Sequence, residues 1–290
     1  MGTTTRDLGL TFAGGGNRAL YQLGLMRRWR ERLLPRVAAV SGVSAGACML
    51  TVMLAEREEQ VRTYFAARRG GVRRNLDWTA LLRREPIAPH GSIYRDTLLH
   101  AYEGGGFERV KRAPFPVLML AAEIPRPLPS ALGTFVGFGA YQLEKSVRPG
   151  LVHPTFGRQL GFRPFVFDAR ECESAEELAA LVLASSATPP FTPLGRFRGR
   201  TLIDGGVIDN NPAFVTEQIA SVRRNIIVMT RPYPESRTGL QGRRLYIAPS
   251  RRPPADCWDY RRDAPVDENL ALGEDEAPAH EDAIERLLTG

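Results

Sequence analysis

A serine between two glycines, at the end of an apolar run, is the first residue whose surroundings suit chemistry. The sequence Gly42-Val43-Ser44-Ala45-Gly46 has the form Gly-x-Ser-x-Gly. In this pattern the chain leaves a buried strand, turns sharply at the serine and enters a helix. The flanking glycines are needed because a Cβ atom at either position would clash within so tight a turn. The pattern therefore predicts Ser44 as a nucleophile.

Three consecutive glycines, Gly14, Gly15 and Gly16, occur one predicted strand earlier, and Arg18 follows them. They lie between a strand and the start of a helix, where backbone N–H groups lack partners. Without side chains to cover them, these donors can stabilise an oxyanion. Removing one such donor raises the barrier of a hydrolytic reaction by about 3 kcal/mol. We expect the three glycines to form an oxyanion hole.

The same glycines also fit a nucleotide-binding pattern, Gly14-x-Gly16-x-x-Ala19. That fold requires an acidic residue near the end of the second strand to hold the ribose, and here the second strand ends in Ser41-Gly42-Val43-Ser44. A phosphate-binding P-loop would require a Gly-Lys-Ser/Thr ending, which the loop lacks. The three cysteines show no metal-ligand spacing. We therefore expect neither a cofactor nor a metal.

An aspartate followed by two glycines, Asp204-Gly205-Gly206, ends a short apolar strand predicted over Thr201–Ile203. By itself this triplet could be a simple turn. In open α/β sheets, however, ligands bind at the edge where strands end, and Asp204 is predicted to lie at that edge. The Asp204 carboxylate is accordingly expected near the place where a ligand would bind.

A histidine is the usual base for a catalytic serine, and the chain has His90, His100, His153 and His280. Only His280 follows Asp204, as the order in α/β-hydrolases requires, and it lies in a polar tail where we expect it to be exposed to solvent. The other three lie outside any motif and are expected to be surface or structural residues. No histidine is therefore expected to act as the base for Ser44.

The elements that would position these residues alternate between strand and helix. Apolar patterns predict strands at Leu8–Ala13 and Val37–Val40, and helices at about Asn17–Arg32 and Ala45–Ala67. This alternation is typical of an α/β fold with a mainly parallel sheet. The stretch Pro125–Gly150 is rich in proline and glycine and is predicted to be a mobile loop or lid.

The order Gly-Gly-Gly-x-Arg, Gly-x-Ser-x-Gly and Asp-Gly-Gly resembles that of the patatin-like phospholipases. Two further segments share the resemblance. Ala184-Ser185-Ser186-Ala187-Thr188-Pro189 is similar to the family's Ala-Ser-x-Ala-x-Pro segment, and Asp209-Asn210-Asn211-Pro212 is similar to the stretch after the aspartate. The motifs cover about Leu8 to Pro212, whereas the tail from about Arg231 matches only loosely.

The resemblance implies a three-layer α/β/α fold, lipid acyl-hydrolase activity and a Ser–Asp dyad without histidine. It makes Ser44 the nucleophile, Asp204 the base and Gly14–Gly16 the oxyanion hole. Asp204 would then accept the proton itself, for which we expect burial to raise its pKa from a reference value of about 3.9. Supporting roles fall to the following residues: Arg18, Gly42, Gly46, Gly205 and Gly206. We expect one domain over residues 1–290, with a motif-bearing core at about 8–230 and a C-terminal strand and helical tail at about 231–290.

The predicted activity is that of a phospholipase A or lysophospholipase. Two alternatives remain open: a thioesterase or small-ester esterase, because the same machinery cleaves other acyl bonds, and a non-enzymatic lipid- or partner-binding module on the same scaffold. Phe135, Val136, Phe138 and Tyr141 are candidates to line or cover an acyl groove, or else to pack against the sheet.

The chain carries a net charge of +7, and Lys111 and Lys145 are the only lysines among its 39 basic residues. The arginine-rich stretch Arg57–Arg84 could rest on anionic lipid head groups or simply form a solvated helix and loop. Met1–Arg6 lacks the apolar segment of a secretory signal, and no apolar run approaches the roughly 18 residues that span a bilayer. We expect a cytoplasmic protein that contacts membranes peripherally and binds a lipid ester but no nucleic acid; the oligomeric state is not predicted.

Overall fold

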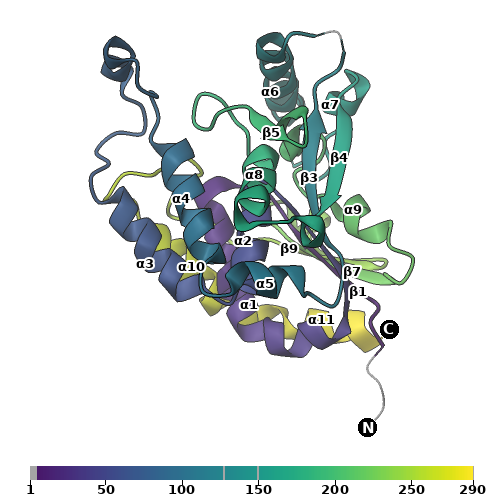
Figure 1. The fold of residues 1–290 in the computed structure, drawn as a ribbon. Helices are drawn as coiled ribbons and strands as arrows, with labels where there is room; N and C mark the ends of the chain where they lie inside the picture. Colours follow the sequence, from purple (N-terminus) through teal and green to yellow (C-terminus); the bar gives the residue numbers. More distant parts are fainter. Residues whose placement is uncertain (1–4, 127, 149, 290) are drawn as a thin grey trace.

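A mixed nine-stranded sheet forms the centre of the protein (Figure 1). The computed structural model describes residues 5–126, 128–148 and 150–289, so residues 1–4 of the segment predicted to lack a signal lie outside it. Five neighbouring strands run parallel, in the order β3 (Val117–Glu123), β2 (Val37–Val43), β1 (Leu8–Phe12), β7 (Arg224–Val228) and β9 (Arg244–Ile247).

The remaining strands extend this parallel centre in antiparallel fashion. β8 (Gly239–Gln241) pairs with β9 at one edge. At the other end, β4 (Arg163–Asp168) and β6 (Arg200–Asp204) both pair with β3, and β5 (Gly195–Phe197) pairs with β6. The predicted α/β class with a mainly parallel central sheet is confirmed.

Helices cover both faces of the sheet, because successive side chains of a strand point to opposite sides. In β3, Met119 packs in one buried cluster with residues of α1 (Leu20–Leu33), α2 (Ala45–Leu54), α4 (His90–Tyr102) and α8 (Ala175–Ser185). Its neighbours Leu118 and Leu120 pack in a second cluster with residues of α6 (Ser130–Val147) and α9 (Ala213–Glu217). The three-layer α/β/α arrangement follows from this division.

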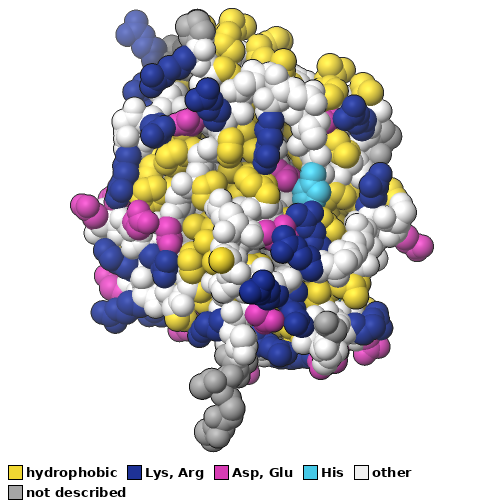
Figure 2. Space-filling view, turned by 90° about the vertical axis from the view of Figure 1, so that its right-hand side faces the viewer, with side chains coloured by type: hydrophobic (Ala, Val, Ile, Leu, Met, Phe, Trp, Pro, Cys, Tyr) yellow, Lys and Arg dark blue, Asp and Glu magenta, His cyan; other side chains and the backbone are white. Residues whose placement is uncertain are grey.

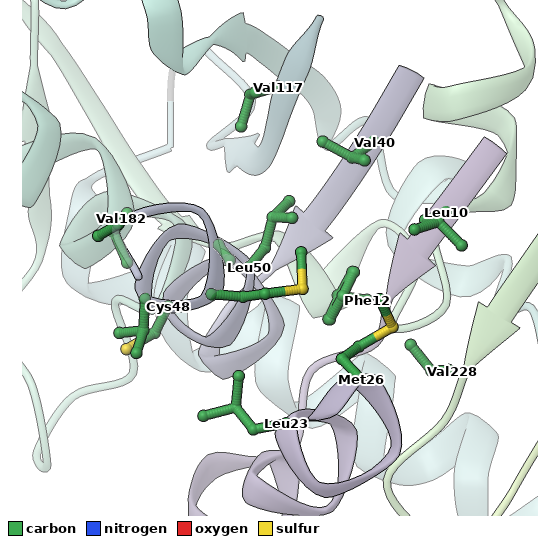
Figure 3. Close-up of a cluster of buried hydrophobic side chains, with 14 of the residues drawn as sticks. Leu10, Phe12, Leu23, Met26, Val40, Cys48, Leu50, Val117, Val182 and Val228 are labelled. Carbon is green, nitrogen blue, oxygen red and sulfur yellow. The ribbon is translucent and has the colours of Figure 1, made fainter. Parts of the chain in front are cut away.

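The larger cluster joins the sheet to the first two long helices (Figure 3). Leu10 and Phe12 of β1 face Met26 of α1, and Leu50 of α2 lies beside Val40 of β2. All five are at most 1% exposed, and fully burying such a side chain contributes about 1.5–3 kcal/mol. This packing fixes where the ends of β1 and β2 lie.

The other helical segments lie between these elements or follow them. They are η1 (Gly16–Ala19), η2 (Leu34–Arg36), α3 (Glu58–Arg69), η3 (Trp78–Arg83), α5 (Gly106–Lys111), α7 (Phe156–Gln159), η4 (Ala169–Glu171), η5 (Gly205–Val207), η6 (Glu235–Arg237), α10 (Val266–Glu276), η7 (Ala277–His280) and α11 (Glu281–Thr289). None of the helices within the described ranges is both long and apolar enough to cross a membrane.

The stretch Pro125–Gly150, predicted as a mobile loop or lid, is mostly helical, so the prediction of a loop was wrong and that of a lid stays a prediction. α6 occupies Ser130–Val147. Its glycines serve close packing: a Cβ atom on Gly133 would lie 2.2 Å from the Ile124 side chain, and one on Gly137 would lie 3.0 Å from Ile203. Glycine at these points therefore lets the helix approach the sheet and does not break it.

Two further helical segments differ from what the sequence pattern predicted. The single helix predicted over Ala45–Ala67 is two helices, α2 and α3, because the chain turns at Glu56, whose φ is +54°. The tail contains an additional helix, α10, which lies against α1. Glycines allow this approach too: a Cβ atom on Gly24 would lie 2.1 Å from the Leu270 carbonyl oxygen.

Candidate active site

Ser44 lies in a strained turn between β2 and α2. Its φ and ψ are 54° and −131°, a region that side-chain-bearing residues rarely adopt and that is found most often at functional sites. The glycines on either side are sterically required. A Cβ atom on Gly42 would lie 2.7 Å from the Ala47 Cα atom, and one on Gly46 would lie 2.4 Å from the Phe12 carbonyl oxygen. The predicted turn of the nucleophile pattern is thus present in the chain.

Asp204 reaches Ser44 because two strands meet end to end beside β3. β4 pairs with β3 along Leu118–Glu123, which leaves the other edge of β3 to β2 and β6. On that edge β2 ends with Val43 opposite Leu120, and β6 arrives from the opposite direction and ends with Asp204 opposite Ala121. Asp204 therefore lies among strand ends, as expected, but it is carried there by an antiparallel strand.

The carboxyl group of Asp204 is buried, and the Ser44 hydroxyl lies close enough to lower its pKa. The carboxyl group accepts hydrogen bonds from the Gly206 amide at 2.7 Å and from the Thr188 hydroxyl at 3.3 Å. Burial raises its pKa from 3.8 to about 6, against the opposing effect of these hydrogen bonds. Gly205 has no room for a side chain, because a Cβ atom would lie 2.3 Å from the Leu120 carbonyl oxygen.

The hydroxyl of Ser185 lies where the β2–β3 ladder would otherwise continue. It accepts a hydrogen bond from the Ser44 amide at 2.8 Å and donates one to the Leu120 carbonyl oxygen at 2.6 Å. The side chain thus replaces a direct strand-to-strand hydrogen bond and satisfies two buried backbone groups. Ser185 and Thr188 both lie in the family-like segment Ala184–Pro189, and neither residue was predicted to have a role of its own.

The glycine loop lies beside Ser44, and its three amides are not equivalent. The Gly14 N–H donates to the Asn210 carbonyl oxygen at 3.1 Å, and the Gly14 carbonyl oxygen accepts from the Asn210 side chain at 3.1 Å. Within the described part of the chain, the Gly15 and Gly16 amides donate to no protein acceptor. Arg18 donates through Nε to the Gly15 carbonyl oxygen at 3.4 Å. Among the residues that the structure describes, two of the three glycines therefore keep a donor without a protein acceptor, which sequence alone could not distinguish.

A cavity of about 160 Å³ opens over the Ser44–Asp204 pair. α6 lines one part of it with Phe138, Tyr141 and Lys145, and the tail of the chain contributes Arg231 and Trp258. Of the aromatic residues predicted to line a groove, Phe138 and Tyr141 do so.

The remaining two candidates for that groove lie elsewhere. Val136 packs in the second cluster, while Phe135 is 78% exposed. No sequence signal pointed to Arg231 or Trp258, because they lie in the loosely matched tail.

None of the four histidines lines this cavity. His280, predicted to be exposed, is instead half-buried with its ring against the edge of Trp29, and burial lowers its pKa. The prediction for His280 was wrong because η7 and α11 fold back onto α1.

The other three histidines contact residues outside the Ser44–Asp204 pair. His90 is fully buried and bonds through Nε2 to the Trp258 carbonyl oxygen at 2.9 Å. His153 bonds to Asp209 at 2.8 Å, and His100 stacks on Tyr64.

The three-layer α/β/α fold and the buried serine–aspartate pair at the ends of the central strands define the class of this molecule. Comparison with family models places the chain within that class: the model described as patatin-like phospholipase matches residues 10–216. Because the match covers well over half of the sequence, the chain belongs to the patatin-like phospholipase family. Membership supports lipid acyl-hydrolase activity in general terms.

Comparison with solved structures finds a similarity to VipD from Legionella pneumophila. The two chains are 12% identical and superpose with a TM-score of 0.45, over 97% of this chain and 67% of the other. A search of curated proteins finds no match.

Proposed function

We propose that the protein hydrolyses ester bonds of phospholipids or lysophospholipids, with Ser44 as nucleophile and Asp204 as general base. The observation that carries this proposal is the position of the Ser44 hydroxyl beside a buried carboxyl group, in one cavity, where burial raises the pKa of that carboxyl to about 6. Such a pKa leaves the carboxylate largely ionised at neutral pH, yet basic enough to accept a proton in the transition state.

The reaction divides into two acyl transfers. In the first, Asp204 accepts the Ser44 proton as Oγ attacks the ester carbonyl carbon, and the protonated Asp204 then gives that proton to the departing alcohol oxygen. In the second, Asp204 accepts a proton from water, the resulting hydroxide attacks the acyl-Ser44 carbonyl carbon, and the proton returns to Oγ as the fatty acid leaves. Each tetrahedral intermediate carries a negative oxygen.

In our proposal the Gly15 and Gly16 amides stabilise that oxygen, since both glycines line the cavity with Ser44 and their amides donate to no acceptor among the described residues. Gly14 has a different role in this proposal. Its N–H is bound to Asn210, so Gly14 fixes the position of the loop, and Arg18 supports the same loop through the Gly15 carbonyl oxygen.

A fluorophosphonate probe tests the nucleophile, because it forms an adduct with an activated serine. We expect one adduct, located on Ser44 by mass spectrometry and absent from Ser44→Ala. We further expect Asp204→Asn to abolish ester hydrolysis and His280→Ala to retain it, because His280 lies outside the cavity. Full hydrolysis by Asp204→Asn would contradict the dyad, and the absence of any adduct would favour a binding module.

The same chemistry would cleave a thioester or a small ester, so substrate chemistry needs a separate comparison. The cavity is lined in part by Phe138, Val207 and Trp258, which suit an acyl chain. Release of fatty acid from defined phospholipids and lysophospholipids, compared with acyl-CoA and short esters, distinguishes these substrates by their kcat/KM values.

Peripheral contact with an anionic membrane is the second part of our proposal, and exposed apolar side chains favour it. α6 presents Phe135 at 78% and Val147 at 63% exposure, and η3 presents Leu82 at 89%. The segment that contains η3 projects from the same end of the molecule as α6 (Figure 1). On the side of that end that Figure 2 shows, apolar and basic side chains adjoin. Residues 124–164 contain five basic residues and one acidic residue, which suits a negative surface.

Sedimentation with phosphatidylglycerol vesicles tests this contact without hydrolysis when Ser44→Ala protein is used. We expect Phe135→Ser in that background to bind the vesicles several-fold more weakly. Leu240→Ser is the matched control, because Leu240 is 44% exposed but lies on β8 at the far edge of the sheet. Equal binding by both variants would contradict a contact through α6.

A further inference from the structure

Three cationic side chains line the cavity that contains Ser44, and they come from three separate segments. Arg18 follows the glycine loop, Lys145 lies on α6, and Arg231 follows β7. Asp204 is the single acidic residue among the cavity-lining residues. Lys145 and Arg231 belong to none of the motifs from which the dyad was predicted, and Arg231 lies beyond the segment matched by the family model.

The two arginines have neutral hydrogen-bond partners. Arg231 donates through Nε to the Tyr233 hydroxyl at 3.0 Å, and Arg18 donates to the Gly15 carbonyl oxygen. In the ranges that the structure describes, none of the three cations forms an ion pair with a carboxylate. The neighbouring Glu144 is occupied elsewhere, because its carboxylate accepts hydrogen bonds from the Thr155 and Phe156 amides at 2.8 Å each.

Arg231 and Arg18 both lie near enough to Lys145 to affect its charge. Partial burial, together with the positive charges of Arg231 and Arg18, lowers the pKa of Lys145. Holding like charges together in a partly desolvated cavity is unfavourable unless an anion joins them. The cluster is therefore arranged for a negatively charged group that enters the same cavity as the ester.

We propose that Lys145 and Arg231, together with Arg18, bind the phosphate group of a glycerophospholipid while its ester carbonyl lies at Ser44. A guanidinium matches phosphate oxygens through two parallel hydrogen bonds, and an ammonium adds a third, movable donor. The inference rests on the proposed ester hydrolysis and adds to it a cause of selectivity: an anionic phosphodiester is preferred over a neutral glyceride with the same acyl chains.

Two monomeric substrates that differ only in the head group test this assignment. Short-chain phosphatidylglycerol carries the phosphate, and the matching short-chain diacylglycerol lacks it. For Lys145→Gln and for Arg231→Gln we expect KM for phosphatidylglycerol to rise about tenfold, with kcat little changed, because one charge-assisted contact is lost. For diacylglycerol, both constants are expected to stay within twofold of the parent protein.

Arg196→Gln is the matched control, because Arg196 is exposed on β5 and does not line the cavity. Unchanged KM for phosphatidylglycerol in both cavity variants would overturn the assignment, as would an equal loss on both substrates. Inorganic phosphate separates a lipid head group from a free anion: inhibition at concentrations below the KM for phosphatidylglycerol would overturn the head-group assignment, and weaker inhibition would support it. If the parent protein hydrolyses neither substrate, the proposed function itself fails.

Discussion

The Ser44 amide donates a hydrogen bond to the Ser185 hydroxyl at 2.8 Å, so the strained turn is held by a side chain from α8. The same hydroxyl donates to the Leu120 carbonyl oxygen on β3. One side chain thus connects the end of β2 to the strand on which β2 and β6 meet. The position of Ser44 relative to Asp204 depends on this connection as well as on the glycines of the turn.

Replacing Ser185 by alanine is expected to leave the Ser44 amide and the Leu120 carbonyl oxygen buried without a partner. Each unsatisfied group costs about 1–3 kcal/mol. Denaturant unfolding should therefore show a loss of about 2 kcal/mol or more for Ser185→Ala, together with a lower kcat. Ser146→Ala is the control, because Ser146 is exposed on α6, and a stability change equal to that of the control would contradict the connecting role.

Asp204→Asn is expected to stabilise the fold at neutral pH while it removes activity. The folded-state pKa of about 6 lies above the unfolded value of 3.8, so the contribution of Asp204 to stability is fully present below pH 3.8 and is lost as the pH rises through 6. At about pH 7.5 the ionised carboxylate then costs up to about 3 kcal/mol. Asparagine avoids this cost, so Tm should rise at about pH 7.5 and change little near pH 3.5. An equal Tm change at both pH values would contradict the assignment.

The pH profile of hydrolysis should follow the ionisation of Asp204. Because the base must be ionised, kcat/KM is expected to rise tenfold per pH unit below about pH 6 and to level off above it. Thr188→Val removes a hydrogen bond that lowers the Asp204 pKa, so its acidic limb should shift to higher pH. Initial rates on a soluble short-chain ester across the pH range provide the measurement, and a shift to lower pH would have the wrong sign.

Gly16→Ala tests the glycine loop. Gly16 has a φ of +55°, and a Cβ atom would lie 2.1 Å from the Cys257 carbonyl oxygen, so the loop must move. Displacing a donor of an oxyanion hole lowers kcat by roughly 10²–10³-fold. Gly71→Ala is the control, because a Cβ atom on Gly71 meets nothing within 4 Å. Hydrolysis by Gly16→Ala at the parent rate would exclude this loop from the chemistry.

Local patterns predicted the turn at Ser44, the glycine loop and the strand before Asp204, because each depends on a few adjacent residues. The antiparallel direction of β6 could not be predicted in this way, since it depends on which edge of β3 remains open. The helix α6 was predicted as a loop for a related reason. Gly133 and Gly137 are explained by Ile124 and Ile203, which they contact only once the chain has folded.

The difference among the three glycine amides has the same origin. Gly14 is occupied by Asn210, which lies 196 positions further along the chain, and local sequence does not reveal such a partner. His280 was predicted to be exposed because its neighbours are polar, whereas the fold places its ring against Trp29. Long-range contacts of this kind determined where the prediction of the site was incomplete.

The segment after residue 216, beyond the family match, returns to the cavity at Arg231, Cys257 and Trp258. There the Cys257 carbonyl oxygen accepts the Asn17 amide hydrogen bond at 3.1 Å, directly next to the glycine loop. Substitutions in this C-terminal stretch would consequently reshape the wall of the cavity and leave Ser44 and Asp204 in place, so the two parts of the cavity can change independently.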